Sequence, residues 1–254
     1  MSQLHLNARY LEFQASLEDA APELLEAFSP PLLIKIPTGW QAAEHKILWI
    51  GQETAGWSWE GERLRAHGLA WDYPDIASLG DFAQHKEAVE ALTYGYGEFD
   101  FAADHPASRG PFWRYFRRAL KAVEPHGPTS MIWTNVVRCS ANSGQGYTPW
   151  AVPEAIRSAF LVRQRGLLAA EIEVLRPTLT IFVSGPYYDV FVSDAFPGCE
   201  GVALAPFSIR QAARYTHPTL PRASFRTYHP GYLNRDELGF RPIQAMIDFY
   251  VAER

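Results

Sequence analysis

Short apolar runs that alternate with helical patterns are the main feature of this chain. Four runs rich in β-branched and aromatic residues, each bounded by turn formers, predict strands over residues 46–51, 129–135, 178–185 and 224–229. Apolar residues recur at helical spacing over 153–175, and helices are also predicted over 10–28, 79–91, 111–123 and 236–251. Strands separated by helices need crossover connections. We therefore predict an α/β fold, a three-layer αβα sandwich around a central, mainly parallel four-stranded sheet.

Length and composition limit the kind of protein. With 254 residues, 47% of them hydrophobic, the chain is long enough for one well-buried domain, which we expect to span residues 1–254. Two cysteines are too few for a disulfide scaffold or an iron–sulfur cluster, and the eight histidines lack the paired spacing of zinc sites. We expect neither a metal nor a cofactor. No export signal or membrane-spanning stretch is recognisable, so we expect a cytoplasmic monomer without membrane contact.

The net charge of −5 argues against coating nucleic acid by bulk electrostatics, so any such contact has to be local. The only concentrated basic stretch runs from Arg114 to Lys121, with Arg109 just upstream. Taken alone, this stretch is best interpreted as a solvated helix face. It becomes a candidate for phosphate contacts only if a DNA site lies nearby.

Polar residues follow the first two predicted strands, at the edge where ligands of parallel sheets bind. The first strand leads into Gly51-Gln52-Glu53, in which Glu53 offers a carboxylate to a reaction. The second ends in Asn135, whose amide both donates and accepts hydrogen bonds. Each residue also has a structural interpretation, because Glu53 can cap a helix and Asn135 can satisfy loop amides.

The other two predicted strands are followed by a turn that could bind an anion and by an imidazole. The third leads into Ser184-Gly185-Pro186, where backbone amides at a helix start would suit a phosphate. The fourth places His229 ahead of a rigid turn, although His229 alone would usually be a hydrogen-bonded core histidine. Polar groups converging on one sheet edge from four elements favour a pocket over four separate structural roles.

These motifs resemble those of the uracil-DNA glycosylase superfamily. Gly51-Gln52-Glu53-Thr54-Ala55-Gly56 is similar to the family's first motif, which reads Gly-Gln-Asp-Pro-Tyr-His in its best-known branch. His67-Gly68-Leu69-Ala70-Trp71 is similar to the segment that ends in a base-stacking aromatic residue. Asn135 resembles the asparagine that ends the second strand, and His229-Pro230-Gly231-Tyr232-Leu233 resembles the His-Pro-Ser-Pro-Leu motif.

The resemblance implies a monofunctional DNA glycosylase, which flips a pyrimidine out of DNA, hydrolyses its N-glycosidic bond and leaves an abasic site. It implies that Glu53 stabilises the sugar cation and orients the attacking water, while His229 donates to the departing base. Asn135 would read the edge of the base.

The remaining site residues follow from the same resemblance. Gln52 and Ala55 would line the base pocket, and Trp71 would stack on the base, with Phe112 or Trp113 as competing assignments and core packing as the alternative for Trp71. Tyr232 and Leu233 are candidate wedges for the vacated stack. The residues expected to contact the DNA backbone are Arg109, Ser184, Gly185, Gly231 and Arg235.

Three departures from the family pattern bear on the substrate. Ala55 stands where the best-known branch has a tyrosine that crowds carbon 5 of the pyrimidine, Glu53 replaces an aspartate, and Gly231 replaces a serine that touches DNA phosphate. The resemblance therefore favours a pyrimidine modified at carbon 5, such as the hydroxymethylated or glucosylated cytosine of phage DNA, removed in antiviral defence.

Three other functions are open on the sequence. One is a uracil-DNA glycosylase of base-excision repair, and another is a non-catalytic nucleic-acid-binding module of the same fold. The third is a small-molecule hydrolase using Ser184 and His229, but the Gly-x-Ser-x-Gly elbow of such enzymes is missing.

Overall fold

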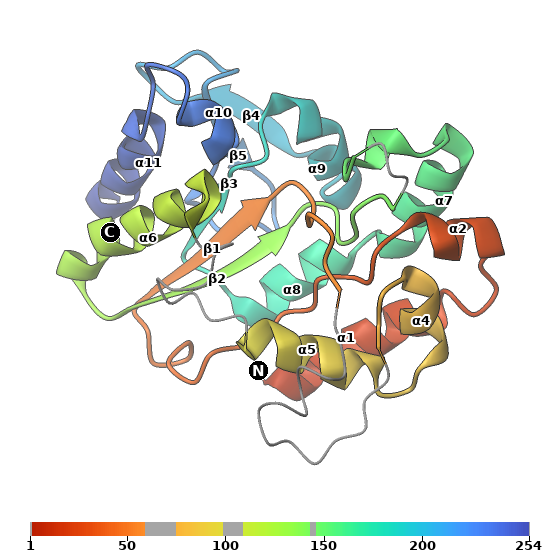
Figure 1. Cartoon of the computed structure of the whole chain (residues 1–254). Helices are drawn as coiled ribbons and strands as arrows, with labels where there is room; N and C mark the ends of the chain where they lie inside the picture. Colours follow the sequence, from red (N-terminus) through yellow and green to blue (C-terminus); the bar gives the residue numbers. More distant parts are fainter. Residues whose placement is uncertain (1, 59–74, 99–108, 143–145, 254) are drawn as a thin grey trace. The chain divides into compact units, whose positions relative to one another are not determined.

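The predicted apolar runs form strands in a computed structural model that describes residues 2–58, 75–98, 109–142 and 146–253 (Figure 1). The strands are β1 (His45–Gly51), β2 (Thr129–Asn135), β3 (Leu179–Phe182) and β6 (Ser224–Thr227). Almost all their side chains are buried, which explains why they read as apolar runs without alternation. β1 pairs in parallel with β2 and β3, and β3 pairs in parallel with β6. The α/β class is confirmed.

The sheet is larger than predicted. It has six strands in the order β2-β1-β3-β6-β5-β4, because β4 (Glu200–Ala203) and β5 (Ala212–Thr216) form a hairpin that adds antiparallel to β6. The prediction of a four-stranded sheet was therefore wrong, and the sheet is mixed. All four residues of β4 are exposed. This edge strand consequently lacks the apolar pattern by which strands are recognised.

Several predicted helices are interrupted. The span 153–175 is divided into α7 (Glu154–Gln164) and α8 (Leu167–Leu175), since Gly166 between them has φ +84°, which a right-handed helix excludes. Residues 10–28 and 79–91 fall on the pairs α1 (Gln3–Ala15) with α2 (Pro22–Ala27) and α4 (Leu79–Gln84) with α5 (Ala88–Glu98). The C-terminal helix α11 (Arg241–Ala252) begins later than predicted. Only α6 (Pro111–Val123) has the predicted bounds.

Shorter elements complete the description. They are α9 (Asp189–Ala195), α10 (Pro230–Leu233) and the 3-10 helices η2 (Glu124–His126), η3 (Pro149–Ala151) and η4 (Pro186–Tyr188). Within the described ranges, no helix is long and apolar enough to cross a membrane.

The chain divides into two compact units, each built from separated segments. Unit 1 comprises Met1–Lys35, Glu53–Phe99 and Val137–Ala170, and unit 2 comprises Ile36–Gln52, Asp100–Val136 and Glu171–Arg254. The expectation of one domain over residues 1–254 stays a prediction.

Unit 1 is helical, and unit 2 holds the sheet. In unit 1, α1 packs on α4 and α5, α2 packs on α4 and α7, and the rings of Phe28 and Phe160 stack 4.3 Å apart. In unit 2, α6 lies against β1 and β2, and α11 lies against β6 and beside α6 (Figure 1). Phe182 and Phe225 are fully buried in the sheet of unit 2. This packed sheet fixes the positions of the strand ends described next.

Candidate functional site

The carboxyl ends of four strands meet along one edge of the sheet in unit 2. Gly51, the last residue of β1, is paired with Asn135, the last residue of β2. At the neighbouring strands, the Gly185 amide donates to the Thr227 carbonyl over 2.9 Å, which holds the chain ends after β3 and β6 together. His229 follows β6 by two residues. The parallel pairing thus brings Gly51, Asn135, Gly185 and His229 to a common edge.

Gly51 lies so close to Asn135 that no residue with a side chain fits at position 51. A Cβ atom at position 51 would lie 2.3 Å from Oδ1 of Asn135 and 3.0 Å from Cε2 of Phe112. Real Cβ atoms do not approach other atoms so closely, so residue 51 has to be glycine for Asn135 to keep its position. The first motif therefore supplies the space that the asparagine occupies.

The amide of Asn135 is buried, and its nitrogen has no partner in the part of the chain that the structure describes. The residue is 3% exposed, and among the described residues no acceptor lies within hydrogen-bonding distance of Nδ2. A buried amide donor without an acceptor costs about 1–3 kcal/mol. Such a donor at a strand end, beside an aromatic ring, is what a binding site for a polar ligand requires.

Gln52 ties two strand ends together. Its Nε2 donates to the backbone carbonyl of Ser184 over 2.7 Å. The hydroxyl of Ser184 itself is fully buried and has no hydrogen-bond partner in the described part of the chain. Ser184 therefore presents no hydroxyl to a DNA backbone in this structure. It also forms no hydrogen bond with His229, whereas the hydrolase alternative would require one.

The turn after β3 differs from the expected anion site. Gly185 has φ +77°, a conformation that favours glycine. Its N–H is already donated to the Thr227 carbonyl, so this amide is not available to a phosphate. The turn serves instead to join β3 to η4 and α9.

His229 is held as a neutral hydrogen-bond donor. Nδ1 accepts a hydrogen bond from the Gly231 amide over 3.1 Å, so in the neutral ring Nε2 carries the proton. Burial lowers the pKa of His229 from 6.5 to about 4, since a charged imidazolium is poorly solvated there. At neutral pH the ring therefore offers an Nε2–H donor without a positive charge.

Phe112 places an aromatic ring at the same edge. It is half-buried at the start of α6, and its ring lies 6.1 Å from the His229 ring at an interplanar angle of 22°. Trp113 instead packs edge-on against Trp133, at 5.0 Å and 88°, and is buried. Of the competing stacking assignments, Phe112 lies at the site and Trp113 lies in the core. Trp71 is outside the described residues.

The turn after His229 forms the short helix α10, which separates the two candidate wedges. Leu233 is fully buried, whereas Tyr232 is 46% exposed. Arg235 is exposed and its Nε donates to the Gly231 carbonyl over 3.1 Å. Tyr232 is therefore the wedge candidate that a DNA strand can reach without unfolding α10.

Two arginines of the basic stretch on α6 make contacts with other residues of unit 2. Arg114 donates to Oδ1 of Asn234 over 2.8 Å, and the Arg118 guanidinium lies 4.2 Å from the centre of the Phe240 ring. These contacts join α6 to the segment after α10. Arg109, immediately before α6, is exposed. Its phosphate contact stays a prediction.

Glu53 and Ala55 lie in unit 1. Glu53 follows Gln52 directly in the chain and is half-buried, while Ala55 is exposed. In the same turn, the Gly56 amide donates to the Ser140 hydroxyl over 3.3 Å, and Gly56 has φ +73°. A glycine is thus favoured directly after Ala55.

Two residues near this edge were not predicted from the sequence, Tyr187 and Arg210. Tyr187 follows the turn after β3, and the Arg210 guanidinium lies 5.7 Å from the centre of its ring. Arg210 comes just before β5, which runs antiparallel to β6, so that Ala212 pairs with Thr227. The amino end of β5 therefore lies beside the carboxyl end of β6. No local signal in the sequence indicates this pairing.

Other kinds of site find no support in the described residues. In residues 2–58, 75–98, 109–142 and 146–253, no three His, Cys, Asp or Glu side chains come together as a metal site would need. No known protein-family profile matches the chain, and no curated protein matches it.

Proposed function

We propose that the chain is a monofunctional DNA glycosylase of the uracil-DNA glycosylase superfamily, with the three-layer arrangement of that family. The observation that carries the proposal is the buried Nδ2 of Asn135, which has no hydrogen-bond partner among the described residues, at the strand edge that also bears His229 and Phe112. An amide, an N–H donor and a ring face are the groups that recognise a flat heterocycle carrying carbonyl and amino groups along its edge. A nucleobase has this shape and this chemistry.

The state of His229 suits the departure of a base. When an N-glycosidic bond breaks, negative charge develops on the leaving base and positive charge on the sugar. The Nε2–H of a neutral imidazole stabilises an oxygen anion on the base by a hydrogen bond and needs no prior protonation. Since the pKa of His229 is about 4, this donor is present throughout the physiological pH range.

Glu53 is assigned the opposite charge. Its carboxylate is proposed to stabilise the sugar cation and to orient water toward it, because it follows directly on Gln52, whose side chain is anchored at the Ser184 carbonyl. Removal of the carboxylate in Glu53→Gln should abolish base release and retain DNA binding.

The proposed substrate is a cytosine modified at carbon 5, hydroxymethylated or glucosylated as in phage DNA, and the proposed role is antiviral defence. Ala55 supports this choice because it is exposed and small where a tyrosine would block carbon 5. The products would be the free base and an abasic site in the DNA strand, with DNA as the partner.

The proposal is tested with DNA strands that differ at one position, where they carry uracil, mismatched thymine, hydroxymethylcytosine or its glucosylated form. Alkali-labile breaks would report abasic sites. We expect breaks at the modified cytosines and none with Glu53→Gln. Uracil released as fast as the modified bases would identify a repair enzyme instead. Strands that bind without breaking would identify a binding module.

A further inference from the structure

Three tyrosines and an arginine, of which only Tyr228 is half-buried and the others are exposed, form a face next to His229. Tyr187 is 76% exposed, Tyr232 is 46% exposed, and the rings of Tyr228 and Tyr232 lie 4.5 Å apart at 38°. The exposed Arg210 lies over the Tyr187 ring. These four residues, called here the tyrosine–arginine face, come from three segments of unit 2.

Arg210 links the tyrosines of this face. Hydrogen bonds from its guanidinium to the Tyr187 and Tyr228 hydroxyls raise the pKa of Arg210. The arginine therefore stays charged while its plane is held near two rings. The Tyr232 hydroxyl donates a hydrogen bond to the carboxylate of Asp236, whose negative charge raises the pKa of Tyr232.

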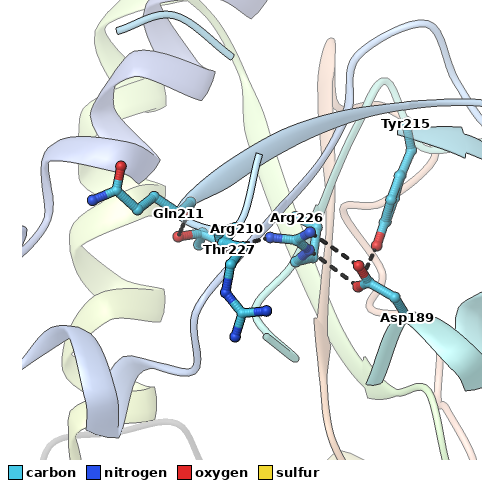
Figure 2. Close-up of polar contacts among 6 residues, drawn as sticks. All are labelled: Asp189, Arg210, Gln211, Tyr215, Arg226 and Thr227. Atoms are coloured by element: carbon cyan, nitrogen blue, oxygen red, sulfur yellow. Dashed lines mark hydrogen bonds and ion pairs between the residues drawn. The ribbon is translucent and has the colours of Figure 1, made fainter. Parts of the chain in front are cut away.

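An ion pair between the buried Arg226 and the half-buried Asp189 fixes two segments of the face. Nε and one terminal nitrogen of Arg226 bind the two carboxylate oxygens of Asp189 at 3.1 and 3.0 Å, and the other terminal nitrogen donates to the Arg210 carbonyl over 2.8 Å (Figure 2). The Tyr215 hydroxyl adds a 2.7 Å bond to Asp189. Asp189 follows Tyr187 by two residues, so Arg226 positions the segments of both Tyr187 and Arg210. A surface positioned in advance loses less freedom when it binds.

We propose that the tyrosine–arginine face binds an unpaired nucleotide of a DNA strand, with its base stacked on Tyr187 and its phosphate paired with Arg210. Exposed aromatic rings beside a cation are the usual means of binding single strands, because every base has a flat face. The location supports the same occupant, since Tyr228 directly precedes His229 and Tyr232 lies in the helix that His229 caps. A strand whose base enters the site would cross this face. The inference rests on the proposed function in one respect, because it takes the bound strand to be the strand from which the base is removed.

The test measures binding to a fluorescein-labelled oligothymidine strand, which has no base to be excised, by fluorescence anisotropy at low salt. We expect Tyr187→Leu to weaken binding about tenfold and Tyr187→Phe, which keeps the ring, to change it less than about twofold. Arg210→Ala should weaken binding and reduce the salt slope by about one. The matched control is Arg222→Ala, because Arg222 is exposed at the amino end of β6. Thermal unfolding of each variant would verify its fold.

The same strand annealed to its complement distinguishes stacking from backbone contact. Tyr187→Leu should not weaken binding of this duplex, whose bases are covered. Equal losses on single and double strands, unchanged binding by Tyr187→Leu, or no binding of single strands by the natural chain would each overturn the proposal. If Tyr187→Leu loses strand binding while no base is released from any DNA, the face is supported and the glycosylase proposal fails. If the natural chain releases a base while Tyr187→Leu binds the single strand as tightly as the natural chain does, the glycosylase proposal is supported and the face proposal fails.

Discussion

The backbone amide of Gly231 donates a hydrogen bond to Nδ1 of His229 over 3.1 Å, and this contact determines which ring nitrogen carries the proton. The ring is half-buried and partial burial lowers its pKa to about 4, so the folded chain favours the neutral imidazole. Both features follow from the short turn in which His229 caps α10.

Acid should destabilise the protein through His229. Between pH 6.5 and 4 the unfolded chain binds a proton at this residue and the folded chain does not, so this contribution is complete above pH 6.5 and is lost as the pH falls toward 4. The loss is at most about 3 kcal/mol. Urea unfolding at pH 7.5 and pH 4 should show a smaller decrease for His229→Gln than for the natural chain. An NMR titration that places the His229 pKa at 6.5 would contradict this account.

Replacement of Gly51 by alanine should displace the Asn135 amide. The added Cβ would lie 2.3 Å from Oδ1 of Asn135, so we expect base release to fall at least tenfold and the free energy of unfolding to decrease by about 1–3 kcal/mol. Gly39→Ala is the control, because nothing lies within 4 Å of a Cβ there. Equal activities of the two variants would show that the contact between Gly51 and Asn135 is irrelevant to the reaction.

Asn135 should be costly to stability and essential to activity. Because its Nδ2 has no partner in the described chain, Asn135→Leu should lower the free energy of unfolding by less than about 1 kcal/mol or should raise it. Base release should nevertheless fall by about a hundredfold or more. The comparison is Gln14→Met, since the buried amide of Gln14 donates to the Phe82 and His85 carbonyls. That variant should lose about 1–3 kcal/mol. A larger loss of stability in Asn135→Leu than in Gln14→Met would indicate a structural role for Asn135.

The ring of Phe112 should act in substrate binding. It is half-buried beside His229, so Phe112→Leu should lower kcat/KM about tenfold through lost stacking, and Phe112→Tyr should retain activity. Phe116→Leu serves as the control on the same helix, because Phe116 is buried and packs on Trp49. It should lower the melting temperature rather than kcat/KM. Unchanged kcat/KM in Phe112→Leu would show that Phe112 does not stack on the base.

The sequence predicted the parts of the site that lie at strand ends. Asn135 and His229 could be placed at one edge because buried apolar runs joined by helices form parallel pairs. The rotation of α10, which buries Leu233 and exposes Tyr232, depends on packing that no short motif encodes. Arg210 required the hairpin of β4 and β5, whose exposed edge strand has no apolar pattern. Gln52 was expected at a base, but its donor is bound to the Ser184 carbonyl, a partner 132 residues away.

The central claim is tested most directly by a single-turnover measurement of free base and abasic sites from one DNA strand carrying hydroxymethylcytosine. The natural chain should produce the two in equal amounts, and Asn135→Leu, folded to the same stability, should produce neither. Strand cleavage without free base, or base release that Asn135→Leu retains, would contradict the account.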